Sequence, residues 1–306
     1  MPKDLRILPK LRDSLSFLYV EHAIVEQDHL AIVRIQGSER TPIPIAAITT
    51  LMLGPGVSIT HAAIKVIADS GCSVIWCGEH SAKYYATGMG ETRSAANLIL
   101  QSKLHADVDL HMKVVRRMYQ RRFSDLQCEG LTLQQIRGLE GIRMRETYRR
   151  ASKQYNVKWN KRNYDDNNWD QTDDINKALS MANSVLYAIC QSAIVSLGFS
   201  TGLGFIHTGK MLSFVYDIAD LYKADTSIPA AFSVAGGSYY DLGKQVRIAC
   251  RKAFHESELL KRIPKDIEWI FDMRSYAEAQ VAPTTGDLWN GENDSIAGGI
   301  NHGSEV

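Results

Sequence analysis

The hydrophobic pattern of this chain changes its period once, near residue 90, and this change limits the possible folds more than any other feature. Residues 14–87 contain short runs rich in β-branched and aromatic residues, such as SLSFLYV and CSVIWC, separated by turn sequences such as GSER and GPG. From about Ser94 onward, apolar residues recur at helical spacing over long segments. The pattern predicts an α+β chain with a β-rich N-terminal domain followed by an all-α domain.

We expect three parts along the 306 residues: a β-rich domain over 1–90, a helical domain over 91–275 and a flexible tail over 276–306. The tail is acidic, because no Lys or Arg follows Arg274 while five acids do. A charged segment of this kind buries too little apolar surface to order itself.

Capping residues predict where several helices begin. Thr60 precedes HAAIKVIADSG within the β-rich domain, and Thr132 precedes LQQIRGLEGIRMRETY. Asp173 or Asp174 opens an apolar segment that ends at Gly198. Residues 95–123 are amphipathic and free of Gly and Pro, which predicts one long helix.

The composition argues against membrane, secreted and zinc-cluster classes. The chain has no run of about 18 apolar residues, and its first residues, MPKDLRILPK, lack the apolar core of a signal peptide. Its five cysteines are scattered and form no C-x-x-C pair. We therefore expect a cytoplasmic protein with reduced thiols and no membrane contact.

Positive charge is concentrated in one stretch of the chain. Residues 112–162 contain fourteen Lys or Arg and four Asp or Glu, although the whole chain has a net charge of only +1. Such asymmetry favours a polyanionic partner. The alternative is a set of solvated helix faces with no partner.

The segment GFIHTGKMLSFVYDIADLYKADT places two carboxylates inside an apolar helical pattern. Asp217 and Asp220 are three residues apart and lie on one helix face, with Asp217 on the side that packs. Burying an uncompensated carboxylate is costly, and a divalent metal ion removes that cost. His207 can add an imidazole, so the stretch suits Mg²⁺ or Mn²⁺ and phosphodiester chemistry.

The same residues have structural explanations. Asp217 can pair with an Arg or Lys, Asp220 can be a solvated surface residue, and His207 can be a cap or core histidine. Glu140 is a further candidate, since it lies between Gly138 and Gly141, where a ligand phosphate or another backbone could approach. An acid among arginines is also commonly part of a salt bridge, so both explanations stay open.

Several familiar motifs are absent from the sequence. It contains no P-loop, no H-E-x-x-H and no G-x-S-x-G. The glycines of GLGFIHTG lack the strand, helix and distal acid of a dinucleotide site. These absences disfavour ATP-dependent, zinc-protease and dehydrogenase chemistry.

With these motifs in view, the chain resembles the CRISPR-associated adaptation integrases, the catalytic subunits that insert new spacers, and specifically their type I-E branch. The resemblance is carried by LGPGVSITHAAIKVIADSGCSVIWCGE, HMKVVRRMYQRRF, QIRGLEGIRMRETY, KQYNVKWNKRNY, DDINKALSMANSVLYAICQSAIVSLG and GFIHTGKMLSFVYDIADLYKADT. It extends from about Leu15 to Arg274. It implies a β-rich N-terminal domain for dimerisation and DNA-end contact, followed by a helical catalytic domain.

The resemblance also implies a site and a reaction. Glu140, His207 and Asp220 would bind the Mg²⁺ or Mn²⁺, with Asp217 as a supporting acid. The 3′-hydroxyl of an incoming DNA fragment would attack a phosphodiester at the border of the CRISPR repeat. With water as the nucleophile, the same site would act as an endonuclease.

The implied partners are double-stranded DNA with single-stranded 3′ ends and CRISPR repeat DNA. The resemblance also implies a homodimer, and two such dimers that join a dimer of a small ferredoxin-like adaptation partner. Matching positions imply DNA contacts, because cations bind phosphates and aromatic rings stack on bases. These positions are His22, Arg40, Lys65, Lys83, Tyr164, Tyr187, Lys210, Tyr216 and Lys223. His22 stands where an aromatic wedge for the duplex end is expected.

Two other functions are compatible with these residues. A DNA-repair nuclease would use the same site to cut branched or single-stranded DNA without joining it. A DNA-binding scaffold would use Glu140, His207 and Asp220 only to support the fold, and metal ions would not affect it.

Overall fold

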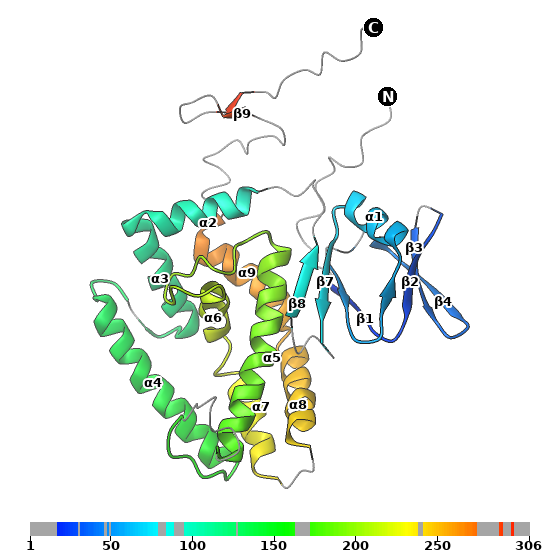
Figure 1. Cartoon of the computed structure of the whole chain (residues 1–306). Coiled ribbons are helices and arrows are strands. Elements are labelled where there is room, and N and C mark those ends of the chain that lie inside the picture. Colours follow the sequence, from blue (N-terminus) through cyan, green and yellow to red (C-terminus); the bar gives the residue numbers. More distant parts are fainter. Residues whose placement is uncertain are drawn as a thin grey trace.

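The computed structural model describes residues 17–29, 31–45, 48, 50–78, 84–88, 95–126, 128–162, 172–237, 241–273, 288–289 and 295–296. A β-rich part lies beside a helical part, with most strands in the first and the long helices in the second (Figure 1). The α+β class and its order along the chain are therefore confirmed. The proposed domain limits at residues 90 and 275 stay predictions.

The β-rich part contains two four-stranded sheets. Its strands are β1 (Phe17–Val20), β2 (Ile24–Asp28), β3 (Ala31–Gln36), β4 (Glu39–Ile43), β5 (Thr50–Leu53), β6 (Ser58–Ile59), β7 (Ser73–Cys77) and β8 (Tyr84–Gly88). One sheet has the order β1-β5-β7-β8, with the first three parallel and β8 antiparallel to β7. The other has the order β4-β3-β2-β6 and is built on antiparallel hairpins.

One helix, α1 (His61–Asp69), packs against these sheets. The Thr60 hydroxyl accepts a hydrogen bond from the Ala63 backbone, as a cap does, and Gly71 follows the helix with a φ of +63°. Ala63 and Ile67 point into a core shared by both sheets. The cap and the stop predicted from the sequence are confirmed.

The helical part begins with α2. Its helices are α2 (Ala96–Ala106), α3 (Val108–Arg122), α4 (Leu133–Gln154), α5 (Asp174–Ser196), α6 (Ser213–Asp220), α7 (Ser227–Ala235), α8 (Leu242–Glu256) and α9 (Leu259–Phe271). Thr132 and Asp173 cap α4 and α5 as predicted, and Thr132 forms a capping box with Gln135.

The single long helix predicted over residues 95–123 is wrong. The chain instead forms two helices, α2 and α3, which are separated at Asp107. The backbone of Asp107 is extended, and its side chain accepts a hydrogen bond from the Leu110 backbone N–H. An Asp favours this cap over a helix interior because its short side chain competes for backbone donors. The break redirects the chain while the amphipathic pattern continues.

Helix α5 is the centre of the helical core. It contacts α6, α7, α8 and α9, and most of its side chains are buried. Among the described helices it is the one long and apolar enough to cross a membrane, but 67% of its most apolar window is buried inside the protein. This burial is typical of a core helix in a globular fold.

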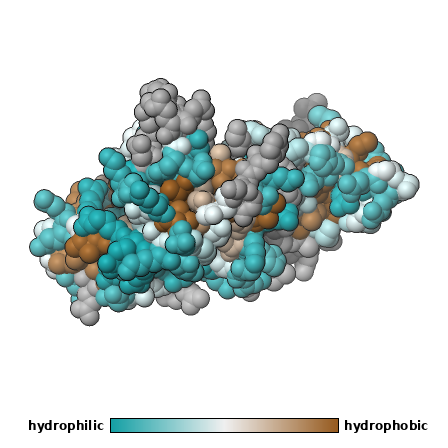
Figure 2. All heavy atoms as spheres, turned by 90° about the horizontal axis from the view of Figure 1, so that it is seen from below, coloured by the Kyte–Doolittle hydropathy of each residue, from teal (hydrophilic) through white to brown (hydrophobic). Residues whose placement is uncertain are grey.

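The sheets join the helical core through α5. Strand β8 packs on α5, and the Thr50 hydroxyl donates to the Ser196 hydroxyl at 2.7 Å in a buried contact. Hydrophilic side chains cover much of one face of the helical part, with hydrophobic patches that are small and separate (Figure 2). Most of the predicted tail lies outside the described residues, except that β9 (Leu288–Trp289) pairs with β10 (Ser295–Ile296).

Candidate active site

Helix α6 separates its two carboxylates into different surroundings. Asp217 is buried, with 1% of its surface exposed, and lies on the same side as Phe214 and Ile218. The Asp220 side chain is 15% exposed and contacts Arg122 and Lys223. The prediction that Asp217 lies on the packed side is confirmed, and Asp220 is not a freely solvated residue.

Asp217 organises the loop that precedes α6. Its Oδ2 accepts hydrogen bonds from the backbone N–H groups of Phe205 at 2.5 Å and Ile206 at 3.0 Å. Its Oδ1 accepts from the backbone N–H of His207 at 2.9 Å and from the His207 ring Nδ1 at 2.7 Å. These donors compensate the buried charge, so the carboxylate needs no metal ion or Arg of its own.

The His207 imidazole is thereby oriented. The hydrogen bond to Asp217 raises the pKa of His207 above its ordinary value, against the effect of burial, and the nearby Asp220 carboxylate adds to the rise. In the neutral ring this bond holds the proton on Nδ1 and leaves the Nε2 lone pair available to a ligand. A carboxylate behind a histidine is a common arrangement for fixing a metal-binding imidazole.

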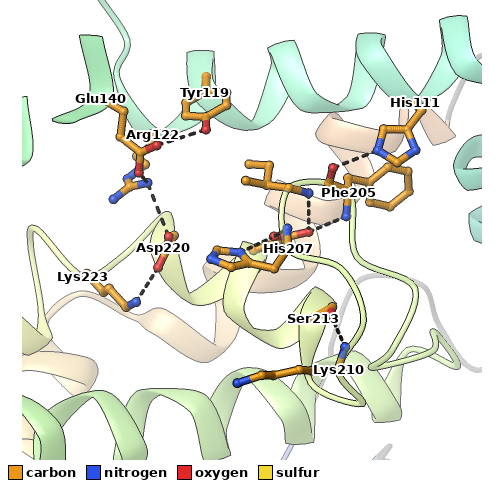
Figure 3. Close-up of polar contacts among 12 residues, drawn as sticks. His111, Tyr119, Arg122, Glu140, Phe205, His207, Lys210, Ser213, Asp220 and Lys223 are labelled. Atoms are coloured by element: carbon orange, nitrogen blue, oxygen red, sulfur yellow. Dashed lines mark hydrogen bonds and ion pairs between the residues drawn. The ribbon is translucent and has the colours of Figure 1, made fainter. Parts of the chain in front are cut away.

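A second histidine braces the same loop from α3. His111 Nε2 lies 2.8 Å from the Phe205 carbonyl oxygen (Figure 3). His111 Nδ1 lies 3.0 Å from the His105 carbonyl oxygen. Phe205 thus bonds Asp217 through its N–H and His111 through its C=O. The loop backbone is fixed from both sides.

Gly204 makes this tight loop possible. A Cβ at this position would lie 2.4 Å from the His207 carbonyl oxygen and 2.7 Å from the Ser213 Cβ. Any larger residue would push the loop away from the start of α6.

Glu140 reaches the site from α4. Its Oε2 accepts from the Tyr119 hydroxyl at 3.0 Å, and its Oε1 forms a short hydrogen bond and ion pair with Arg122 Nη1 (Figure 3). Burial, and then the Glu140 carboxylate, raise the pKa of Tyr119, so this phenol stays protonated and donates to Glu140. The salt-bridge explanation left open for Glu140 is what this structure contains.

Arg122 also connects Glu140 to Asp220. Its Nη1 lies 3.5 Å from Asp220 Oδ2, while Lys223 Nζ lies 2.5 Å from Asp220 Oδ1. The Arg122 side chain is only 6% exposed. The two acids, which are 80 positions apart in the sequence, therefore lie on either side of one buried guanidinium.

An aromatic pair supports this cluster. Lys223 Nζ lies 5.1 Å from the centre of the Tyr187 ring, and Tyr187 packs edge-on against Tyr216, with their ring centres 5.0 Å apart. Tyr216 in turn contacts the His207 ring. Burial lowers the pKa of Lys223, but Asp220 and Tyr187 more than reverse this effect, so the net shift is upward and the ammonium stays charged.

The predicted ligand set of Glu140, His207 and Asp220 has the right chemistry for Mg²⁺ or Mn²⁺, since two carboxylates and one imidazole nitrogen are suitable donors. Among the described residues, no three His, Cys, Asp or Glu side chains come close enough to share an ion. In this arrangement the Arg122 guanidinium lies between the two carboxylates.

The other predicted DNA contacts fall into two groups. Lys210 is exposed in the loop before α6, near the site (Figure 3). His22, Arg40 and Lys65 are exposed in the β-rich part, where Arg40 pairs with Glu26 at 3.2 Å. Lys83 and Tyr164 lie outside the described residues. All nine positions stay predictions as DNA contacts.

Sequence reasoning missed Tyr119, Arg122 and His111. Arg122 was one of fourteen cations in the basic stretch, and nothing in its spacing distinguishes it from its neighbours. His111 has no local motif. A Cβ placed on Gly138 would meet no described atom within 4 Å apart from its own stretch of helix, and one on Gly141 would lie 3.8 Å from Arg145 Nη1.

Comparisons with known proteins identify the family of this chain. The family model described as "CRISPR associated protein Cas1" matches residues 18–127 and 120–234. A CRISPR-associated endonuclease Cas1 of Thermus thermophilus is 47% identical, over 99% of this chain and 94% of that protein. Its counterpart in Escherichia coli K12 is 39% identical, over 84% of this chain and 85% of that protein. A crystal structure of a TtCas1–DNA complex has a TM-score of 0.80 and 51% identity, and the match covers 86% of this chain and 99% of that one. The chain therefore belongs to the Cas1 family of CRISPR-associated proteins.

Proposed function

We propose that this chain is a metal-dependent DNA integrase and endonuclease that inserts short foreign DNA fragments into a CRISPR array. One observation carries the proposal. Glu140 and Asp220 both contact the guanidinium of Arg122, and they lie beside the His207 imidazole, which Asp217 orients. Paired carboxylates with an oriented imidazole suit phosphodiester chemistry. The relatives at 39% and 47% identity are named endonucleases, which supports the cutting activity.

The reaction is a direct transesterification. The 3′-hydroxyl oxygen of the incoming fragment attacks a phosphorus atom at the repeat border, a new P–O bond forms, and the bond to the 3′-oxygen of the repeat strand breaks. The hydroxyl proton passes to solvent, and the leaving 3′-oxygen takes up a proton. Water in place of the 3′-hydroxyl gives hydrolysis by the same route.

Glu140, His207 and Asp220 would hold Mg²⁺ or Mn²⁺. When bound, the ion polarises the scissile phosphate and favours the attacking oxygen as a nucleophile. Asp217 keeps the His207 ring turned so that Nε2 is available, and it holds the loop by its backbone. Asp217 is therefore a positioning residue.

Cations near the acids would bind the DNA backbone. Lys210 is exposed and extends from the loop next to His207, which suits a phosphate contact. Lys223 is largely buried against Asp220, so its role is to hold that carboxylate in place and to add positive charge at the reacting phosphate. Tyr216 lies between His207 and Tyr187 and supports both rings.

The natural substrates would be duplexes with single-stranded 3′ ends and CRISPR repeat DNA. A relative of this chain has been solved as a DNA complex, which supports DNA binding. The type I-E branch, the homodimer, its assembly with a small ferredoxin-like adaptation partner and a cytoplasmic location are part of the proposal. His22, Arg40 and Lys65, all exposed in the β-rich part, would contact the DNA end.

The second candidate function is repair of branched or single-stranded DNA by hydrolysis alone. The same site could serve it, and the word endonuclease in the names of the relatives fits the cutting step. The two functions differ in their products, because integration joins two DNA molecules and repair only cuts one.

The test is an integration assay with a short duplex, a plasmid carrying a CRISPR repeat, and Mg²⁺ or Mn²⁺, run with and without the adaptation partner. Asp220→Asn and Glu140→Gln should abolish joining while DNA affinity persists. Asp272→Asn, which alters a partly exposed ion pair with Arg117, is the matched control and should join normally. Joining by Asp220→Asn at the wild-type rate would refute the proposed site, and cleavage without joining under every condition would favour the repair nuclease.

A further inference from the structure

Arg122 is the last residue of α3, and its guanidinium lies where the two acids of the site face each other. Nη1 contacts both Glu140 Oε1 and Asp220 Oδ2 (Figure 3). The Arg122 side chain is 6% exposed and the two carboxylates are 22% and 15% exposed, so this is a partly buried contact rather than a surface salt bridge. The integrase chemistry proposed above gives Arg122 no role, although it is the residue that joins the two acids.

The charges of the cluster are balanced without a metal ion. Glu140 and Asp220 are paired with Arg122 and Lys223, two acids against two bases. A divalent cation added to these four partly buried groups would leave an excess of two positive charges among them, which is costly where water is scarce. One of the two bases must leave the carboxylates when a metal ion binds.

Arg122 is the base better placed to leave. Lys223 Nζ lies 2.5 Å from Asp220 and also packs over the Tyr187 ring, so this ring holds it in place in addition to the carboxylate. Apart from the two carboxylates, Arg122 contacts apolar side chains: Nη2 lies 3.1 Å from the Met144 sulfur, and the guanidinium lies 5.1 Å from the centre of the Phe123 ring. Among the described residues, its buried Nε has no hydrogen-bond partner. Its place in the site therefore depends on the two carboxylates.

We infer that the Arg122 guanidinium and the divalent metal ion compete for Glu140 and Asp220, so that the ion enters the site only when Arg122 moves out. The inference rests on the proposed metal-dependent function. Arg122 holds the two acids together, and prevents their mutual repulsion, while no ion is bound. The apparent metal affinity is then the intrinsic affinity multiplied by the fraction of molecules in which the guanidinium lies outside the site.

The test measures Mn²⁺ binding to the full chain, by the loss of the free-ion resonance in electron paramagnetic resonance, and the melting temperature with and without Mn²⁺. Arg122→Gln should bind Mn²⁺ tighter than wild type, by about tenfold or more. It should melt lower than wild type without Mn²⁺ and gain more from its addition. Arg122→Lys keeps the charge but loses the planar guanidinium whose Nη1 contacts both carboxylates, so its affinity should lie between those of wild type and Arg122→Gln.

Two controls separate this inference from the proposed function. Arg117→Gln, on the same helix and paired with Asp272 at 2.7 Å, should bind Mn²⁺ as wild type does. Asp220→Asn should lose Mn²⁺ binding in the wild-type and Arg122→Gln backgrounds. Equal or weaker binding by Arg122→Gln and Arg122→Lys, with Asp220→Asn still losing the ion, overturns the competition and leaves the metal site standing. No Mn²⁺ binding by wild type or either Arg122 variant overturns both.

Discussion

Asp217 and His207 are bound to each other twice: one carboxylate oxygen, Oδ1, accepts from both the ring Nδ1 at 2.7 Å and the backbone N–H at 2.9 Å. The second oxygen accepts from Phe205 and Ile206. A single buried side chain thus fixes the backbone of the loop and the orientation of its imidazole. Asp217 is therefore a positioning residue, whereas Asp220 and Glu140 are the acids that contact the Arg122 guanidinium.

Asp217→Asn should reduce joining by about 10- to 100-fold, the usual cost of losing a carboxylate behind a metal-binding histidine. The amide nitrogen of Asn would face backbone donors, so the free energy of unfolding should fall by about 1–3 kcal/mol as well. Initial rates of integration and urea denaturation measure the two effects. Wild-type rates with wild-type stability would show that the carboxylate charge has no role in the loop.

His111→Gln should loosen the loop without touching the acids. Both His111 ring nitrogens face carbonyl oxygens, and the single amide group of Gln cannot reach both. The loss of one partly buried hydrogen bond should cost about 1 kcal/mol of stability. Hydrogen exchange of the amides of residues 205–207 reports on the loop directly, and unchanged protection there would contradict the bracing role.

Lys210→Ala should weaken DNA binding without weakening the fold. An exposed lysine that binds one phosphate contributes about one unit to the salt dependence of affinity, so the slope of log K against log salt should fall by about 1. Stability should stay within about 0.5 kcal/mol of wild type. Lys261→Ala, an exposed lysine on α9 paired with Glu258, is the control and should keep the full slope. An unchanged slope for Lys210→Ala would remove it from the DNA interface.

Asp266→Asn should destabilise the helical core. This carboxylate is 3% exposed and accepts from Arg121 Nε at 2.7 Å and from the Tyr222 hydroxyl at 2.7 Å. Arg121 is 43% exposed, so solvent weakens its attraction to Asp266. The free energy of unfolding should therefore fall by about 2–3 kcal/mol, less than for a fully buried pair. Urea denaturation measures it, with the exposed neighbour Glu268→Gln as the control. Equal stability of the two variants would mean that Arg121 and Tyr222 find other partners.

Local rules predicted much of the fold. The change from strand to helix periodicity, the caps at Thr60, Thr132 and Asp173, and the buried side of Asp217 all follow from short-range chemistry. The break at Asp107 was missed because the apolar pattern continues through it, so only the preference of Asp for a cap marked the change of direction. Strand β4 begins inside GSER, which the sequence analysis assigned to a turn, since ERTPI has few apolar residues and lies at a sheet edge.

The sequence analysis named Glu140, Asp220 and Lys223 of this cluster but not Arg122. Carboxylates inside an apolar helix are unusual enough to be noticed, whereas one arginine among fourteen cations is not. That Arg122 reaches both Glu140 and Asp220 depends on how α3, α4 and α6 pack, and no local pattern encodes that packing.

The hydroxyl contact between Thr50 and Ser196 has a mechanical consequence. Ser196 ends α5, and Tyr187, under Lys223, lies nine residues earlier on the same helix, a separation on the order of 14 Å along its axis. The sheet is thus bonded to the C-terminal end of α5, while Tyr187 on the same helix packs against Lys223 in the site. A displacement of strand β5 would therefore be transmitted through α5 to Tyr187 and Lys223, because a continuous helix bends little over this distance.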